Sequence, residues 1–181
     1  EAVNTSGILN FSGVQENPYT SRFYEPNAAP HVTGYVQAIF PEELIAYRRL
    51  GYSGGEMVGK AGIEKWGEEY LRGREAASLY AVSADGSFEN SIAEVDSQPA
   101  DSILLTVDKD LQMQAQAAMD GLPGAIVVME LNTGRVLTMV SSPIYDANLF
   151  DSNNRNSINL SNMVNDPGQL LINRATQGSY P

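Results

Sequence analysis

The chain has 181 residues, of which 43% are hydrophobic and 18% charged, as is typical of a globular protein with one core or two smaller ones rather than a disordered chain. The formal net charge of −11 repels phosphate backbones, so nucleic acid is not expected as a partner. The sequence contains no cysteine, which excludes disulfides, thiolate metal sites and cysteine nucleophiles.

The first elements predicted along the chain are short and separated by turns. Residues 1–30 are rich in Asn, Ser and Pro, which favours extended or turn backbone. Alternation of residue types predicts a strand over 31–40. Pro41 followed by two glutamates, with two arginines and a glycine at the other end, predicts a short helix over 41–52.

A second helix and a hairpin follow. Four apolar residues at helical spacing predict one helix over 62–73 with a single buried face. These residues are Ile63, Trp66, Tyr70 and Leu71. Two alternating runs flank Asp85-Gly86, a dipeptide common in tight turns, and so predict a β-hairpin over 77–95.

The second half predicts a strand over 103–107, a helix over 109–122 and a strongly apolar hairpin over 124–143. The two strands of that hairpin are expected to be largely buried, and the helix can cover one of their faces. Residues 142–181 are predicted to be mostly polar loop. Because little in the sequence covers the remaining apolar surface, we expect self-association through 124–141, or disorder beyond about residue 150.

A near match to a phosphate-binding loop occurs at 54–61, where glycines and a lysine have suitable spacing. Ala61 replaces the Ser or Thr that would hold magnesium, and Glu56 would place a negative charge in the phosphate cradle. We interpret this stretch as a glycine-rich turn before a helix. The sequence therefore predicts no metal site and no cofactor.

His31 is the only histidine, and no G-x-S-x-G turn accompanies it, so a structural histidine is favoured over a catalytic one. The serine acyl-enzyme signature S-x-x-K requires a serine three residues before a lysine. Those positions are occupied by Met57, Gly62 and Thr106, and no K-T-G or K-S-G follows. No catalytic residue is assigned.

Five stretches nevertheless follow the order of motifs in a known family. RFYEPNAAPHVTGYV contains an R-x-Y…H-x-x-G-Y-V pattern, with Glu25 where proline is usual. VGKAGIEKWGEEYLRG contains G-x-x-G-x-E…L-x-G. The residues that carry these two patterns are Arg22, His31, Gly34, Gly59, Gly62, Glu64, Leu71 and Gly73.

The other three stretches are LLTVDKDLQMQAQAAM, with Asp108 and Gln112, then GAIVVMELNTGRVLTMVSSPIYDANLF, and finally LLINRATQGSYP, with Asn173 and Arg174. With these five stretches the chain resembles the class B penicillin-binding proteins, bacterial cell-wall D,D-transpeptidases, over nearly its whole length. The last stretch resembles the approach to P-G-S-x-x-K, so the resemblance places the family's nucleophilic serine a few residues beyond Pro181.

The resemblance implies an α+β fold in two parts. Residues 1–98 would form the dimerisation or pedestal domain, a mixed domain with short helices and a β-hairpin. Residues 99–181 would form the N-terminal part of the transpeptidase domain, an incomplete α/β piece truncated before the nucleophile. The family's membrane anchor is absent from the sequence, which has no apolar run long enough to cross a bilayer.

The function implied is a non-catalytic scaffold that is inactive alone, within a parent that cross-links peptidoglycan and binds penicillin. The partners implied are the remainder of its own transpeptidase domain, membrane-bound cell-wall synthesis proteins and a second copy in a homodimer. The expected location is the extracytoplasmic face of the bacterial membrane. Two alternatives stay open: an enzyme completed by a second polypeptide, and a structural or adhesion module of the cell envelope with no enzymatic parent.

The matched residues also suggest local roles. Gly59 and Gly62 permit turn conformations and close packing before a helix. Glu64 can accept backbone N–H bonds, pair with Arg22 or Arg72, or remain solvated. Asp108 is a natural N-cap. An adhesion module would not need Gly62–Glu64 to lie beside Arg22, so their separation distinguishes the two readings.

Overall fold

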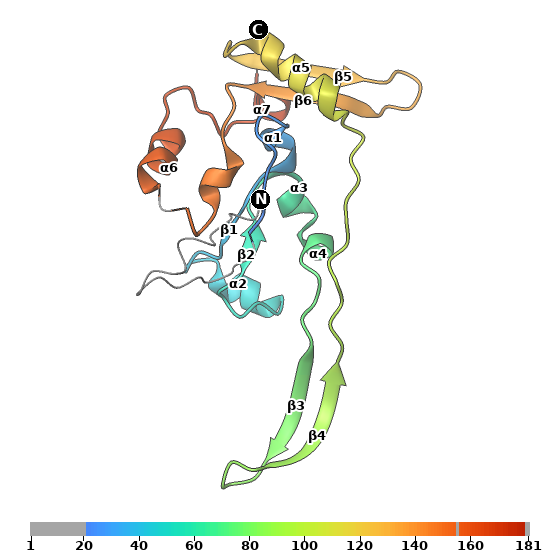
Figure 1. The fold of residues 1–181 in the computed structure, drawn as a ribbon, viewed down its shortest axis with the longest axis vertical. Coiled ribbons are helices and arrows are strands. Elements are labelled where there is room, and N and C mark those ends of the chain that lie inside the picture. Colours follow the sequence, from blue (N-terminus) through green and yellow to red (C-terminus); the bar gives the residue numbers. More distant parts are fainter. Residues whose placement is uncertain (1–20, 155, 180–181) are drawn as a thin grey trace, which may run out of the picture.

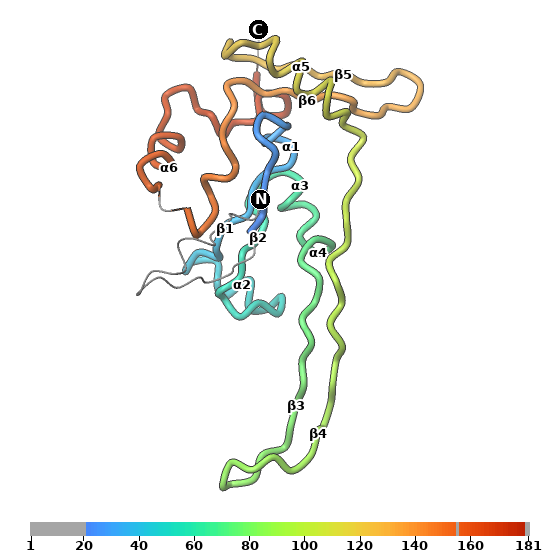
Figure 2. The backbone as a smooth tube through the Cα atoms, in the orientation of Figure 1, coloured from blue at the N-terminus to red at the C-terminus, as the bar shows by residue number. Residues whose placement is uncertain are grey.

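The computed structural model describes residues 21–154 and 156–179. Short helices and three separate two-stranded antiparallel sheets make up these residues (Figure 1), which confirms the predicted α+β class. The predictions for residues 1–20 lie outside the described residues. The path of the backbone in Figure 2 shows a central body, a hairpin layer at one end and a long arm at the other.

The central body contains the smallest sheet, in which Val36 pairs with Gly59 and Ala38 with Met57. Its core is formed by Ile39, Tyr52 and Val58, all less than 9% exposed. The elements of this body are α1 (Pro30–Thr33), β1 (Val36–Ala38), α2 (Leu44–Arg49), β2 (Met57–Gly59), α3 (Gly62–Trp66) and α4 (Glu68–Leu71).

The prediction of a strand over 31–40 is wrong for its first part. Pro30 occupies the first turn of α1, where its missing N–H costs nothing, and Gly34 ends that helix in a backbone conformation with φ of +78°. Only Val36–Ala38 is extended and paired. The punctuation by proline and glycine therefore outweighs the alternation of residue types.

The single helix predicted over 62–73 is divided at Gly67 into α3 and α4. A β-carbon at Gly67 would lie 2.3 Å from the side chain of Ile103, so the missing side chain lets the later segment approach. Trp66 is 69% exposed and Tyr70 is 50% exposed, and their rings lie 6.1 Å apart on the surface. The prediction of one buried face is thus wrong for these two residues.

The near match to a phosphate-binding loop is a closed turn. The carboxylate of Glu56 accepts hydrogen bonds from the N–H groups of Ser53, at 2.7 Å, and Gly54, at 2.6 Å. Hydrogen bonds from the Ser53 side chain and these N–H groups lower the pKa of Glu56 to about 2. The donors that a phosphate would need already bind a carboxylate of the chain itself.

The predicted hairpin over 77–95 is confirmed as β3 (Ala77–Val82) and β4 (Phe88–Val95). It projects from the body as a two-stranded arm (Figure 1). At its base, backbone hydrogen bonds join Arg74 and Gln98 in both directions. At its tip, hydrogen bonds from Ser83 and Ser87 lower the pKa of Asp85 to about 2.

The strand predicted over 103–107 does not form. This segment makes isolated contacts with the hairpin that follows it. The Thr106 hydroxyl donates to the carbonyl of Val136 at 2.7 Å, and the N–H of Asp108 donates to the carbonyl of Leu137 at 2.9 Å. Leu104 is 98% exposed. Single contacts without a repeating ladder leave the backbone extended but unpaired.

The helix and apolar hairpin predicted next are confirmed as α5 (Lys109–Met119), β5 (Gly124–Met129) and β6 (Val136–Ser142). Most of β6 is buried, including Thr138 and Val140, whereas the end of β5 is exposed, with Met129 58% accessible. Burial of both strands was thus predicted correctly for β6 only, because no third strand among the described residues pairs with this sheet. Self-association through it stays a prediction.

The prediction of a polar loop over 142–181 is wrong. Its described residues contain a 3-10 helix, η1 (Ala147–Phe150), and the helices α6 (Ser157–Val164) and α7 (Arg174–Gln177). The asparagines that suggested a loop act as N-caps: the side chain of Asn156 accepts from the N–H of Asn159, and that of Asn173 from the N–H of Ala175. Polar composition here marks helix starts.

A second core lies beneath these helices. Tyr145, Ala147, Phe150 and Met163 are all less than 9% exposed. The ring of Tyr35, from the segment before β1, stacks on Phe150 with centroids 3.6 Å apart and planes 6° from parallel. This core therefore joins the early part of the chain to its C-terminal loops.

Candidate functional site at the junction of the body and the C-terminal loops

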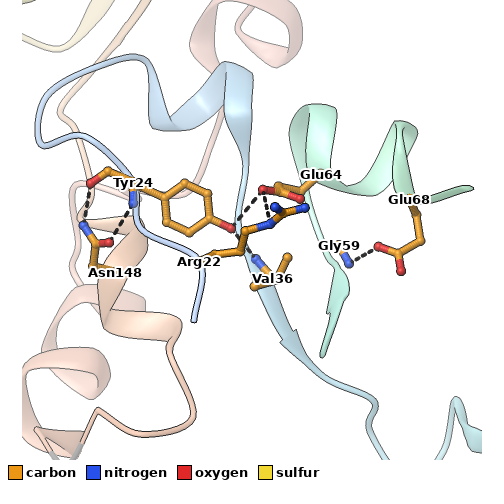
Figure 3. Close-up of polar contacts among 7 residues, drawn as sticks. All are labelled: Arg22, Tyr24, Val36, Gly59, Glu64, Glu68 and Asn148. Carbon is orange, nitrogen blue, oxygen red and sulfur yellow. Dashed lines mark hydrogen bonds and ion pairs between the residues drawn. The ribbon is translucent and has the colours of Figure 1, made fainter. Parts of the chain in front are cut away.

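The centre of the junction is the carboxylate of Glu64 at the start of α3 (Figure 3). Its Oε1 lies 3.2 Å from Nε of Arg22 and accepts a 3.4 Å hydrogen bond from the hydroxyl of Tyr24. The side chain of Glu64 is 12% exposed and that of Arg22 is 45% exposed. Of the two predicted arginine partners, Arg22 pairs with Glu64, whereas Arg72 lies 4.5 Å from the ring of Tyr52.

Tyr24 joins three segments at this point. Its hydroxyl accepts a 2.9 Å hydrogen bond from the N–H of Val36, while its own backbone N–H and carbonyl bind the side-chain amide of Asn148, each at 2.9 Å (Figure 3). Burial, reinforced by the negative charge of Glu64, raises the pKa of Tyr24. The phenol therefore remains protonated and serves as a structural donor at neutral pH.

A second glutamate, Glu68, supports the turn before α3. Its Oε2 accepts from the N–H of Gly59 at 2.7 Å (Figure 3). Its Oε1 accepts from the hydroxyl of Tyr52 at 2.8 Å. Burial and the hydrogen bond to Glu68 raise the pKa of Tyr52 to about 12. Sequence reasoning missed Glu68, although its spacing of four residues from Glu64 was a helical signal that could have indicated it.

The glycines of the motif lie where the backbones of α1 and α3 touch. A β-carbon at Gly34 would lie 1.8 Å from the carbonyl oxygen of Ala61, and one at Gly62 would lie 2.4 Å from that of Val32. Both glycines have positive φ, +78° and +56°. The contact between the two helices therefore requires glycine on each side.

His31 joins α1 to the C-terminal loops. Its ring is 8% exposed and lies edge-on to Tyr145, with centroids 4.8 Å apart. Nε2 is 2.7 Å from the carbonyl oxygen of Leu170, so this nitrogen carries the hydrogen and donates. The side-chain amide of Asn173 in turn donates to the carbonyl of His31 at 3.2 Å.

Two further contacts hold the same loops. The hydroxyl of Tyr145 donates to the carbonyl of Pro30 at 2.7 Å. The guanidinium of Arg174 donates to the carbonyls of Gly168 and Gln169, and its backbone N–H donates to the hydroxyl of Ser141 at 2.9 Å. The segment that precedes α7 is thereby bound both to α1 and to β6.

The remaining predicted residues lie outside this junction. Leu71 is half-buried in α4, and Gly73 packs against the backbone of 98–100 at the base of the arm. Asp108 caps α5 by accepting from the N–H of Leu111 at 2.9 Å, as predicted. The amide of Gln112 binds the backbone N–H and carbonyl of Met139 on β6, at 2.8 and 3.1 Å.

The polar side chains of the junction hold the body and the C-terminal loops together. Their carboxylates and hydroxyls are engaged with one another or with the backbone. Across residues 21–154 and 156–179, no group of three or more His, Asp or Glu side chains is placed to hold a metal ion. Tyr24, Glu68, Tyr145 and Asn148 were not identified from the sequence. Apart from the helical spacing of Glu68 from Glu64, no local pattern marks these residues, because Tyr24, Tyr145 and Asn148 make contacts with residues distant along the chain.

The ion pair at Glu64 can be tested by a change that keeps its shape. Glu64→Gln is expected to lower the free energy of unfolding by about 1 kcal/mol, because it removes the charge that Arg22 and Tyr24 face. Urea denaturation measures this loss. Glu69→Gln, at an exposed glutamate on α4, removes the same charge and is the matched control. Equal losses in the two variants would contradict a specific role for Glu64.

His31 predicts a pH dependence of stability. Burial lowers its pKa from 6.5, the nearby charge of Arg174 lowers it further, and the hydrogen bond to Leu170 acts in the opposite direction. As the pH falls below 6.5, His31 therefore takes up a proton in the unfolded chain before it does so in the folded protein. The free energy of unfolding that is present above pH 6.5 decreases as the pH falls toward the lower pKa of the folded state. His31→Gln keeps an N–H donor and removes the titration. Its free energy of unfolding should fall less steeply between about pH 7 and pH 5 than that of the unmodified chain; parallel curves would refute the assignment.

Comparison with known proteins gives the junction its context. The family described as the penicillin-binding protein dimerisation domain matches residues 5–105, more than half of the chain. The chain belongs to this family. Peptidoglycan D,D-transpeptidase MrdA of Escherichia coli strain K12 is 36% identical over 176 residues, which cover 94% of this chain and 28% of that protein. Penicillin-binding protein 3 of Bacillus subtilis strain 168 is 34% identical over 146 residues, which cover 80% of this chain and 21% of that protein.

Solved structures of penicillin-binding proteins have the same fold. The complex between PBP2 and MreC from Helicobacter pylori matches with a TM-score of 0.67 and 30% identity, covering 83% of this chain and 28% of that one. Pseudomonas aeruginosa PBP2, in complex with WCK 5153, matches with a TM-score of 0.66 and 33% identity, covering 85% and 30%.

These relatives show that the chain is homologous to the dimerisation region of peptidoglycan D,D-transpeptidases, which supports the scaffold reading and not the adhesion alternative. The chain spans 28% of the length of the E. coli relative. None of the helices among the described residues is both long and apolar enough to cross a bilayer. The predicted boundary between residues 98 and 99 stays a prediction.

Proposed function

We propose that this chain is the non-catalytic scaffold of a bacterial peptidoglycan D,D-transpeptidase, with a pedestal over residues 1–98 and the first part of the transpeptidase domain over 99–181. The observation that carries the proposal is the junction itself. Hydrogen bonds connect Tyr24 to Asn148 and His31 to Leu170, pairs that are 124 and 139 residues apart. The pedestal and the start of the transpeptidase domain are thus built as one body.

The chemistry of the parent would be acyl transfer by a serine in an S-x-x-K motif, which the 181 residues lack. In class B penicillin-binding proteins that motif follows the segment resembling LLINRATQGSYP. The residues of this chain would contribute by holding that segment in place. Arg174 donates hydrogen bonds to the carbonyls of Gly168 and Gln169, and the hydroxyl of Ser141 accepts one from the backbone N–H of Arg174. These bonds would fix the orientation of α7, and with it the position of the S-x-x-K motif that follows in the parent.

The partners and location are proposed in the same way. The solved complex of Helicobacter pylori PBP2 with MreC supports a cell-wall synthesis protein as partner. The family's description as a dimerisation domain supports a second copy as another. The extracytoplasmic face of the bacterial membrane is the proposed location, because peptidoglycan D,D-transpeptidases act on the cell wall.

Intact-mass analysis with a fluorescent penicillin tests the proposal. It is applied to the 181-residue chain and to a chain extended through the S-x-x-K and K-T-G motifs. We expect a covalent adduct on the extended chain and none on the shorter one. An extended chain whose motif serine is replaced by alanine is the control. An adduct on the 181-residue chain, or none on any chain, would overturn the proposal.

A further inference from the structure

The arm formed by β3 and β4 has a large apolar surface that nothing among the described residues covers. Among residues 21–154 and 156–179, these two strands are the only ones in its sheet. Leu79, Val82 and Val95 are 59%, 56% and 60% exposed, and Phe88 is 77% exposed. A two-stranded ribbon with this much exposed apolar surface is marginally stable alone and is typical of a binding surface.

The two edges of the arm differ. Both irregularities of the ladder add a residue to β4: Ile92 lies between the partners of Leu79 and Tyr80, and Glu89 between those of Ala81 and Val82. Bulges and charges on an edge strand prevent further pairing. β4 therefore carries both protective features.

The other strand carries neither. Ala77–Val82 has no bulge, no proline and no charged residue (sequence ASLYAV), and no third strand among the described residues pairs with it. Its outward N–H and carbonyl groups form a regular edge of six residues. Such an edge is a template for an added strand.

The negative charge of the arm favours one kind of binding partner at this edge. Residues 75–96 contain five carboxylates and no lysine or arginine. The carboxylates belong to Glu75, Asp85, Glu89, Glu94 and Asp96. A second copy of the arm would bring the same charges, and a surface of anionic lipids would repel them too. An extended segment with basic side chains is attracted along the whole ribbon.

The small side chain of Ser78 would let a basic side chain on an added strand reach an acidic residue of β4. Ser78 pairs directly with Glu94, so the two side chains lie on one face of the ribbon. A lysine on an added strand opposite Ser78 would pass over this small residue toward the Glu94 carboxylate. Apolar residues at alternating positions of the same strand would meet Leu79 and Ala81 on the other face.

We propose that the outer edge of β3 is a docking site for an extended protein segment with alternating basic and apolar residues, which adds to the arm as a third strand. This inference rests on the proposed scaffold function and names the partner class and the place on the scaffold. It involves no residue of the junction and no penicillin, so its failure would leave the adduct experiment unaffected.

The test uses the full chain and a six-residue peptide of alternating lysine and valine, the length of β3. The peptide with glutamate in place of lysine is the control ligand. Fluorescence anisotropy should show binding of the basic peptide alone, weakened by salt. Hydrogen exchange should show new protection within Ala77–Val82 and none within Phe88–Val95. Protection on Phe88–Val95 instead, or no binding, would overturn the proposal.

Two charge-reversed variants complete the design. Glu89→Lys with Glu94→Lys should weaken binding of the basic peptide about tenfold, whereas Glu42→Lys with Glu69→Lys should change it less than about twofold. Both changes alter net charge equally, at glutamates exposed on the surface. Equal weakening would overturn the edge site. Protection of the outward N–H groups of Ala77–Val82 without peptide would also overturn it, indicating a second copy if it depends on protein concentration and the chain's own residues if it does not.

Discussion

Replacing Gly34 by alanine is expected to lower the free energy of unfolding by about 3 kcal/mol or more, because two separate costs add at this residue. Its φ of +78° and ψ of −153° lie in a region that residues with a side chain rarely occupy. The new β-carbon would also lie 1.8 Å from the carbonyl oxygen of Ala61, which is backbone and can yield only if α1 and α3 separate.

Gly51→Ala separates these two costs. Gly51 has a φ of +91°, but a β-carbon there would meet nothing within 4 Å. Gly51→Ala should therefore lower the free energy of unfolding by about 1 kcal/mol, from backbone strain alone. Urea denaturation of both variants gives the comparison. Similar losses would show that the contact between α1 and α3 is looser than the structure describes.

Gln112→Leu is expected to cost about 2 to 3 kcal/mol, because it buries no hydrogen-bonding group in place of the amide and leaves two partly buried backbone groups without partners. Gln112 is 1% exposed, and its amide binds both the N–H and the carbonyl of Met139 on β6. Leucine has a similar size and an equally good helix propensity, so the loss reports the hydrogen bonds rather than the helix. The amide of Met139 should also exchange faster with solvent.

Gln114→Leu is the matched control for this prediction. Gln114 lies on the same helix, α5, and is exposed, so the same substitution there should change the free energy of unfolding by less than about 0.5 kcal/mol. If the two variants lose the same stability, the bonds from Gln112 to β6 do not hold the helix on the hairpin layer.

The exposed arm and the buried junction suggest a division of labour within the proposed scaffold. The junction holds the segment before α7 to the body through His31 and Asn173. The arm extends away from that body (Figure 2), and its uncharged strand β3, within an acidic ribbon, is the proposed edge for a partner. A scaffold of this kind would fix the geometry of the attached domain at one end and recruit a partner at the other.

Features set by neighbouring residues could be predicted from the sequence. One long hairpin was predicted from alternating runs around Asp85-Gly86, the other from two strongly apolar runs around Asn132-Thr133-Gly134, and Asp108 was predicted as the cap of α5. For Glu64, pairing with Arg22 was one of several roles that its charge allowed, and the structure shows that pair. Turn chemistry and capping act within a few residues, so the local sequence contains the information.

Only the tertiary structure decided the rest. It brought Ile103 against Gly67 and left 103–107 unpaired. It also assembled the junction from Tyr24 with Asn148 and His31 with Leu170. The sequence determined which turns, caps and glycines exist, because those depend on adjacent residues; the fold decided which of them meet, because burial and hydrogen bonding between distant segments have no local signature.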